Sequence, residues 1–137
     1  MPAAFVHRLR VRYHECDPQG IVFNANWFAF FDVALTELWR DAFGSYSALV
    51  NRGSDVLVVD ASARFRAPGR FDDEVDISLA IQALGTTSMT TATTVRRGGE
   101  VLVEGRLVHV FVDPATLAKQ EIPAAVRAAL APYIVGE

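Results

Sequence analysis

The chain has 137 residues, a hydrophobic share of 51% and a formal net charge of −3 at pH 7. This size and composition are typical of one compact domain with a sizeable core, so we expect a single domain over residues 1–137. The 13 basic residues are spread along the chain, which argues against nucleic acid or an anionic membrane surface as a partner.

The first residues bear on where the protein works. Basic side chains interrupt the apolar positions of MPAAFVHRLRVRYHEC, and no apolar run approaches membrane-spanning length, so neither a secretory signal nor a membrane span is expected. A single cysteine, Cys16, excludes an internal disulfide. We therefore expect a cytoplasmic protein.

Alternating apolar and arginine side chains predict a first strand from Phe5 to Glu15. The next residues, Asp17-Pro18-Gln19-Gly20, have the composition of a type I turn. On composition alone, Asp17 is more simply explained as a turn residue than as a catalytic one.

The following segment, Ala25 to Phe43, predicts a long helix that ends at Gly44. Its residues are apolar almost throughout and leave almost no polar stripe, which is unusual for a surface helix. We expect a sheet to enclose this helix.

Four later segments are rich in Val, Thr, Ile and Phe and predict strands: Asp55–Arg66, Glu74–Leu84, Ser88–Arg97 and Glu100–Val112. Short Gly- and Pro-containing breaks between them favour antiparallel hairpins. Pro123 is placed to begin a short surface helix near the C-terminus. The predicted fold class is α+β, with one curved five-stranded antiparallel sheet wrapped around the central helix. Its open edges favour pairing with a second copy, as a homodimer or homotetramer.

Three stretches carry a family resemblance: RVRYHECDPQGIVFNANWFAFFDVALTELW, ARFRAPGRFDDEVDISLAI and EGRLVHVFVD. Together they resemble the hotdog-fold acyl-CoA thioesterases, particularly the 4-hydroxybenzoyl-CoA thioesterase group. The resemblance implies a hotdog fold, a dimer with active sites at the subunit interface, and hydrolysis of an aromatic or short-to-medium-chain acyl-CoA. It implies no separate cofactor, because coenzyme A is part of the substrate.

The same resemblance implies roles for individual residues. Asp17 is the expected catalytic carboxylate, either as a nucleophile or as a base that activates water. The backbone amide of Asn24 is expected to polarise the thioester carbonyl, a role suited to the unpaired amides at a helix start. Gly20, Trp27 and Asp32 are expected at the substrate, with Asp32 near a phenolic hydroxyl.

Several observations leave alternatives open. The turn Gly85–Ser88 is neutral where the aromatic-acyl enzymes carry basic residues, so the partners of the coenzyme A phosphates are unassigned. His109 is interpreted as a packed or hydrogen-bonded strand residue, and no metal-ligand spacing is visible. The alternative function is a non-catalytic hotdog subunit that binds acyl thioesters or a protein partner, which would not need Asp17.

Overall fold

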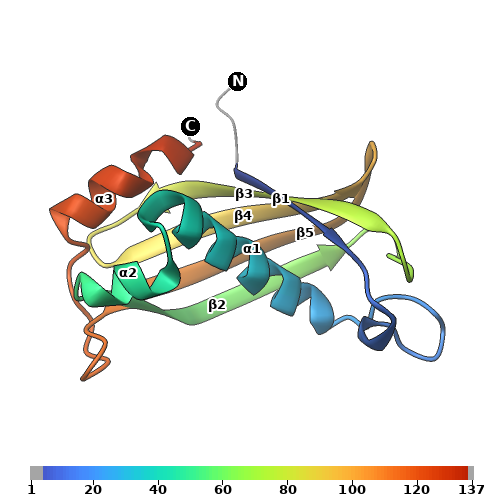
Figure 1. The fold of residues 1–137 in the computed structure, drawn as a ribbon, viewed down its shortest axis with the longest axis horizontal. Coiled ribbons are helices and arrows are strands. Elements are labelled where there is room, and N and C mark those ends of the chain that lie inside the picture. The colour runs from blue at the N-terminus through green and yellow to red at the C-terminus, as the bar shows by residue number, and fades with distance from the viewer. Residues whose placement is uncertain (1–4, 136–137) are drawn as a thin grey trace.

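The computed structural model describes residues 5–135. Its helices and strands, in chain order, are β1 (Phe5–Arg10), α1 (Asn26–Phe43), α2 (Tyr46–Asn51), β2 (Asp55–Phe65), β3 (Glu74–Leu84), β4 (Ser88–Arg97), β5 (Glu100–Val112) and α3 (Ala124–Leu130). The five strands form one antiparallel sheet in the order β1-β3-β4-β5-β2, and α1 lies across one face of it (Figure 1). The predicted α+β fold is confirmed.

The strand predictions hold most clearly where buried and less buried positions alternate, as on β3 and β4. β3, β4 and β5 have the predicted bounds, and β2 ends one residue earlier than predicted. On β3, alternate apolar side chains are buried: Val75, Ile77, Leu79 and Ile81. A strand with this period-two pattern turns one face toward the helix.

The first strand is shorter than predicted, and its end matters for the site. β1 stops at Arg10, and Tyr13–Glu15 form a turn of 3-10 helix. The Glu15 carboxylate accepts the backbone N–H of Arg12 at 2.7 Å and pairs with the Arg12 guanidinium. These bonds turn the chain out of the sheet just before Asp17, which simple alternation does not reveal.

The central helix begins one residue later than predicted and ends as predicted, with Gly44 at a φ of +93°. Its packing against the sheet is close at Gly105, where an added Cβ would lie 2.5 Å from the Phe31 ring. The prediction of a helix with almost no polar stripe is wrong. One stripe of α1 is exposed in the single chain and includes Asp32, Thr36 and Arg40.

Two further helices complete the fold. Helix α2, which was not predicted from the sequence, begins where the Ser45 hydroxyl accepts the Ala48 N–H at 2.9 Å. The C-terminal helix α3 follows Pro123 as expected, but it is more than a surface helix because Val126 and Leu130 are buried. None of the helices within residues 5–135 is long and apolar enough to cross a membrane.

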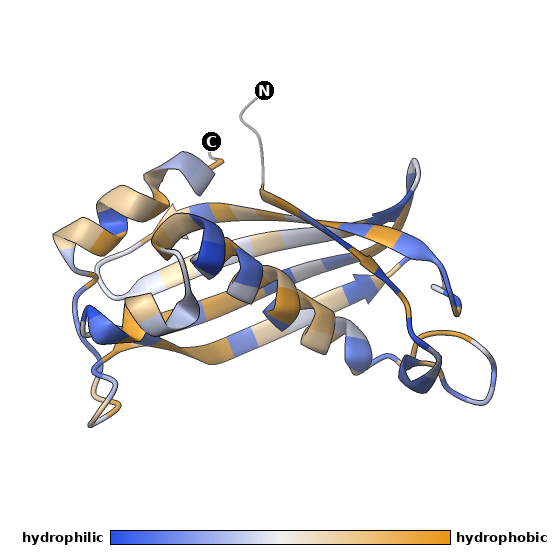
Figure 2. Ribbon diagram, in the orientation of Figure 1, coloured by the Kyte–Doolittle hydropathy of each residue, from blue (hydrophilic) through white to orange (hydrophobic). Residues whose placement is uncertain are grey.

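The two edges of the sheet differ in chemistry. At the β1 edge, Arg8 pairs with Asp76 of β3 at 2.8 Å. At the β2 edge, Leu57, Val58 and Val59 are 40%, 49% and 57% exposed, and Figure 2 shows this apolar stretch along β2. An exposed apolar edge strand is an expected site of pairing with another chain.

Candidate active site

Asp17 opens a tight hairpin loop between an isolated bridge at Cys16 and Val22. Gly20 donates to the Asp17 carbonyl at 2.9 Å, and the Asp17 N–H donates to the Ile21 carbonyl at 2.8 Å. Gly20 has a φ of +78°, the left-handed conformation that a three-residue loop of this kind requires. The backbone geometry is therefore sufficient to explain why glycine occupies this position.

The Asp17 carboxylate is only partly engaged by this loop. Its Oδ1 accepts the Gln19 N–H at 2.8 Å, whereas Oδ2 has no hydrogen-bond partner within residues 5–135. One oxygen fixes the side chain and the other is available for chemistry.

The hollow beside Asp17 has a volume of about 500 Å³ and is lined by Tyr13, His14, Cys16, Asp17, Pro18, Gly20 and Phe71. Tyr13 and Phe71 meet edge to face, with ring centroids 6.0 Å apart. Burial and the nearby carboxylate of Asp17 raise the pKa of the Cys16 thiol, which disfavours the thiolate. The Asp17 carboxylate is thus favoured over the Cys16 thiol as the nucleophile in this hollow.

The helix entry presents a second set of reactive groups. Asn26 N–H donates to the Phe23 carbonyl at 2.8 Å and closes the turn that leads into α1. The backbone N–H groups of Asn24 and Ala25 have no acceptor within the part of the chain that the structure describes. Unpaired amides at a helix start carry the positive end of the helix dipole and suit an oxyanion.

Asn24 and Trp27 line the same hollow of about 230 Å³, together with Ile21, Val22, Phe65, Arg66, Ala67 and Pro68. The Trp27 indole is 3% exposed and packs edge-on against Phe30. An added Cβ at Gly69 would lie 2.8 Å from this indole, so glycine is needed there. Trp27 forms an inner wall of this hollow, while Asp17 lines a different hollow of the single chain.

Asp32 lies apart from both groups, in a hollow of about 320 Å³ between α1, α2 and the sheet. The lining residues are Asp32, Leu35, Thr36, Trp39, Tyr46, Asp55, Val56, Val58 and His109. Burial raises the pKa of the Asp32 carboxyl, although its side chain still reaches solvent in the single chain. The Tyr46 hydroxyl donates to Asp55 at 2.6 Å, and this bond is the main cause that raises the pKa of Tyr46 to about 12.

His109 is the residue of this hollow that sequence reasoning missed. It is 2% exposed, and burial lowers the pKa of its imidazole to about 4. Its Nδ1 is buried and has no hydrogen-bond partner within residues 5–135. The prediction that His109 is a packed strand residue is confirmed, because its side chain is buried. The position of His109 beside the hollow of Asp32 depends on how β5 packs against α1, which the sequence does not reveal.

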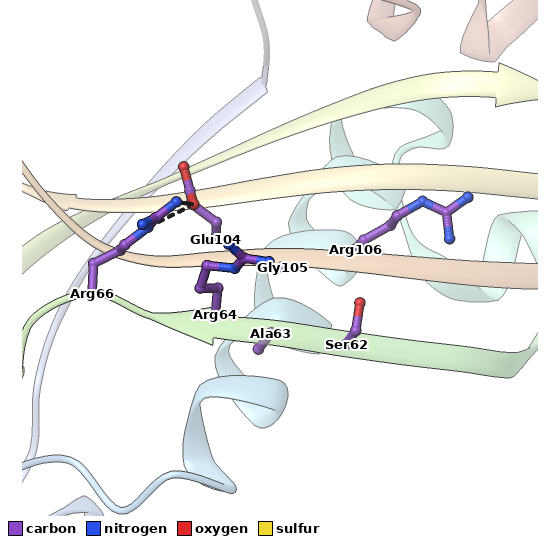
Figure 3. Close-up of a pocket in the computed structure, with 7 residues that line it drawn as sticks. All are labelled: Ser62, Ala63, Arg64, Arg66, Glu104, Gly105 and Arg106. Carbon is purple, nitrogen blue, oxygen red and sulfur yellow. Dashed lines mark hydrogen bonds and ion pairs between the residues drawn. The ribbon is translucent and has the colours of Figure 1, made fainter.

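A fourth hollow, of about 350 Å³, lies over β2 and β5 (Figure 3) and is lined by Ser62, Ala63, Arg64, Arg66, Glu104, Gly105 and Arg106. Arg66 pairs with Glu104 at 2.7 Å, whereas Arg64 forms no ion pair within the described residues. Arg66 also lines the hollow of Asn24. Guanidinium groups in this arrangement suit phosphate recognition.

Comparison with known proteins places these features in context. The family model of the thioesterase superfamily matches residues 19–104. The acyl-CoA thioester hydrolase YbgC of Escherichia coli is 30% identical over 116 residues, which cover 84% of this chain and 87% of that protein. The 1,4-dihydroxy-2-naphthoyl-CoA hydrolase of Nostoc punctiforme is 26% identical over 121 residues, covering 88% of this chain and 82% of that protein.

Solved structures agree with the sequence relatives. A gentisyl-coenzyme A thioesterase superposes with a TM-score of 0.81 at 28% identity, over 92% of this chain and 98% of that chain. The sequence and structure comparisons therefore both extend over most of the chain.

Proposed function

The chain belongs to the thioesterase superfamily and is a thioester hydrolase, and from this we propose that it hydrolyses an aromatic or short-to-medium-chain acyl-CoA to the free acid and coenzyme A. The resemblance to hotdog-fold acyl-CoA thioesterases is confirmed by the family match. Support for an aromatic acyl group comes from the similar proteins named for gentisyl-CoA and 1,4-dihydroxy-2-naphthoyl-CoA.

In the proposed mechanism, Asp17 is the catalytic carboxylate. As a nucleophile, its free Oδ2 attacks the thioester carbonyl, expels the coenzyme A thiolate and leaves a mixed anhydride that water hydrolyses. As a general base, it removes a proton from a water molecule that attacks the same carbonyl. Both routes are favoured by a carboxylate oxygen whose lone pairs are free, and Oδ2 is such an oxygen.

The oxyanion is assigned to the helix entry. In the proposal, the backbone N–H groups of Asn24 and Ala25 donate to the thioester oxygen as it gains negative charge. The leaving group needs little assistance, because a thiol has a reference pKa of about 8.5. Activity therefore does not require a strong general acid beside the sulfur.

A homodimer is proposed because one chain leaves the site open. Asp17 and Asn24 line separate hollows, and the apolar side chains of β2 are exposed along the sheet edge. A second copy docked along β2 would bury these side chains and supply a further wall for the substrate.

The remaining parts of the substrate are assigned from the linings of the hollows. Asp32 is proposed to accept a hydrogen bond from a ring hydroxyl, with Gly20 and Trp27 nearer the thioester. The coenzyme A phosphates are proposed to bind the Arg64 and Arg66 side chains, because Arg66 lines both the arginine hollow and the hollow of Asn24. These residues take the place of the basic turn that the chain lacks at 85–88.

The observation that carries the proposal is the Asp17 carboxylate with one free oxygen in a thioesterase-superfamily chain. The test is a panel of aliphatic and aromatic acyl-CoA esters with a dye that detects the released thiol. We expect thiol release to be fastest with a hydroxyaromatic ester. A folded protein that released no thiol from any ester of the panel would refute acyl-CoA hydrolysis.

A further inference from the structure

His109 combines burial with an unmet hydrogen-bonding need. Its ring is 2% exposed and its Nδ1 has no partner within residues 5–135. Its neighbours across the sheet, Val58 on β2 and Met89 on β4, are apolar and offer no side-chain hydrogen bond. A buried polar atom without a partner costs free energy, so an apolar residue would pack here at lower cost.

The hollow that His109 lines has few other polar groups available. The Thr36 hydroxyl donates to the Asp32 backbone carbonyl at 2.9 Å, and Tyr46 and Asp55 are hydrogen-bonded to each other. Within the described residues, the Asp32 carboxylate and the His109 ring have no side-chain hydrogen bond of their own. The Asp32 carboxylate therefore remains available to a ligand, and on His109 the available atom is Nε2, because Nδ1 is shielded from the hollow.

The rest of the lining is apolar and comes from Leu35 and Trp39 on α1 and from Val56 and Val58 on β2. The volume, about 320 Å³, lies at the lower end of the range of about 300–1,000 Å³ that is usual for small-molecule sites. An apolar slot with a polar group on α1 and another on β5 suits a flat ring that carries a polar group at each of two positions.

We propose that this hollow receives the acyl group and that His109 is a specificity-determining residue, which hydrogen-bonds a second polar substituent while Asp32 binds the first. The inference rests on the proposed function and deepens it: the preferred acyl group is a ring with two hydroxyl groups. Because burial keeps the imidazole neutral near pH 7, its Nε2 either donates or accepts one hydrogen bond according to the tautomer, and a hydroxyl can meet it in both cases.

The test compares benzoyl-CoA with its monohydroxy and dihydroxy derivatives in the wild type and in His109→Leu. In the wild type, the best dihydroxy ester should exceed the best monohydroxy ester in kcat/KM by about tenfold or more, as expected for a site built to bind a hydroxyl. His109→Leu should abolish this gain, so that kcat/KM falls by about tenfold more for the dihydroxy ester than for the monohydroxy ester. His109→Gln, which keeps one donor and one acceptor, should restore part of the gain.

A matched control is available on β4. The Thr93 hydroxyl is also buried without a partner, but Thr93 does not line the hollow. Thr93→Val should therefore leave the preference for two hydroxyls intact. Thermal unfolding of His109→Leu should show equal or greater stability, whereas a histidine kept only for packing would lose stability on replacement.

A binding measurement separates this inference from the proposed hydrolysis. Free dihydroxybenzoates are added to the ¹⁵N-labelled protein, and the imidazole nitrogens of His109 are followed by NMR, with His109→Leu used to assign the signals. A shift at saturation with a dihydroxybenzoate, and a smaller one with benzoate, would support the site even if no ester were hydrolysed. Brisk hydrolysis with no gain from the second hydroxyl and no shift at His109 would overturn the inference and leave the thioesterase function intact.

Discussion

The side chain of Asn26 donates a 2.8 Å hydrogen bond to the backbone carbonyl of Glu15. The same carbonyl accepts the Phe23 N–H at 3.0 Å. One oxygen thus joins the first turn of α1 to the residue two positions before Asp17. The proposed nucleophile and the proposed oxyanion amides are held in relation to each other through this junction.

The first prediction concerns this junction. Asn26→Asp keeps the size of the side chain but removes the donor, so it should lower the free energy of unfolding by about 1 kcal/mol, the usual worth of one hydrogen bond. If the junction also aligns the site, kcat should fall several-fold with little change in KM. Urea unfolding and steady-state kinetics measure the two effects, and unchanged kcat in the destabilised variant would restrict Asn26 to a structural role.

The second prediction concerns self-association along β2. Val59→Lys places a charge on the exposed apolar edge and should disfavour pairing of two copies. Sedimentation should show a dimer for the wild type and a monomer of low activity for the variant at micromolar concentration. Val6→Lys is the matched control, because Val6 is 52% exposed on the opposite edge strand. A wild-type monomer with full activity would contradict the dimer model.

The arginine hollow leads to the third prediction. Arg64→Gln should raise KM for acyl-CoA about tenfold, as expected when one charge-assisted hydrogen bond to phosphate is lost, and should leave kcat nearly unchanged. Esters of pantetheine, which lack the nucleotide phosphates, should show no difference between variant and wild type. Arg40→Gln on α1, where Arg40 pairs with Glu37, controls for the loss of one positive charge. An equal change with both classes of ester would exclude phosphate binding.

Several features that depend on neighbouring residues in the chain were predicted from the sequence, whereas some features that depend on contacts between distant residues were not. The bounds of β3, β4 and β5 followed from their strand-favouring composition and the glycine-containing breaks between them, and the end of α1 followed from Gly44, because these signals are local. The turn at Tyr13–Glu15 depends on one Glu15–Arg12 contact, and α2 has only six residues, too few for a periodic signal. His109 meets the hollow of Asp32 through packing between elements far apart in the chain. The roles of Asp17 and Asn24 came from family resemblance and remain predictions.

The fourth prediction is a pH dependence of stability caused by His109. Its pKa is about 4 in the folded protein and 6.5 as a reference value, so the unfolded chain binds more protons between these two values. Stability should therefore fall as the pH drops from about 6.5 to 4, by on the order of 3 kcal/mol from this group. His109→Leu should remove this part of the slope, while the titration of Asp32 across the hollow remains in both proteins. Parallel curves of unfolding free energy against pH would contradict the prediction.

The last prediction tests the carboxylate chemistry itself. Asp17→Asn retains an Oδ1 that can accept the Gln19 N–H, and the loop bonds of Gly20 and Ile21 involve only backbone atoms, so the fold should survive. The substitution removes the negative charge that both proposed routes require. Turnover should fall by about 10²-fold or more, as expected for loss of a general base, with a much smaller change in KM.

The measurement is steady-state hydrolysis of the best ester, together with thermal unfolding of both proteins. Glu121→Gln provides the control, because Glu121 is an exposed carboxylate between β5 and α3 and its replacement removes the same charge outside the loop and outside the hollows described above. A rapid-mixing experiment with excess wild-type enzyme distinguishes the two routes. If Asp17 forms an anhydride, thiol should be released before the free acid; if Asp17 activates water, both should be released together. Full turnover in a folded Asp17→Asn variant would mean that the aspartate serves only the turn, and that another group hydrolyses the thioester.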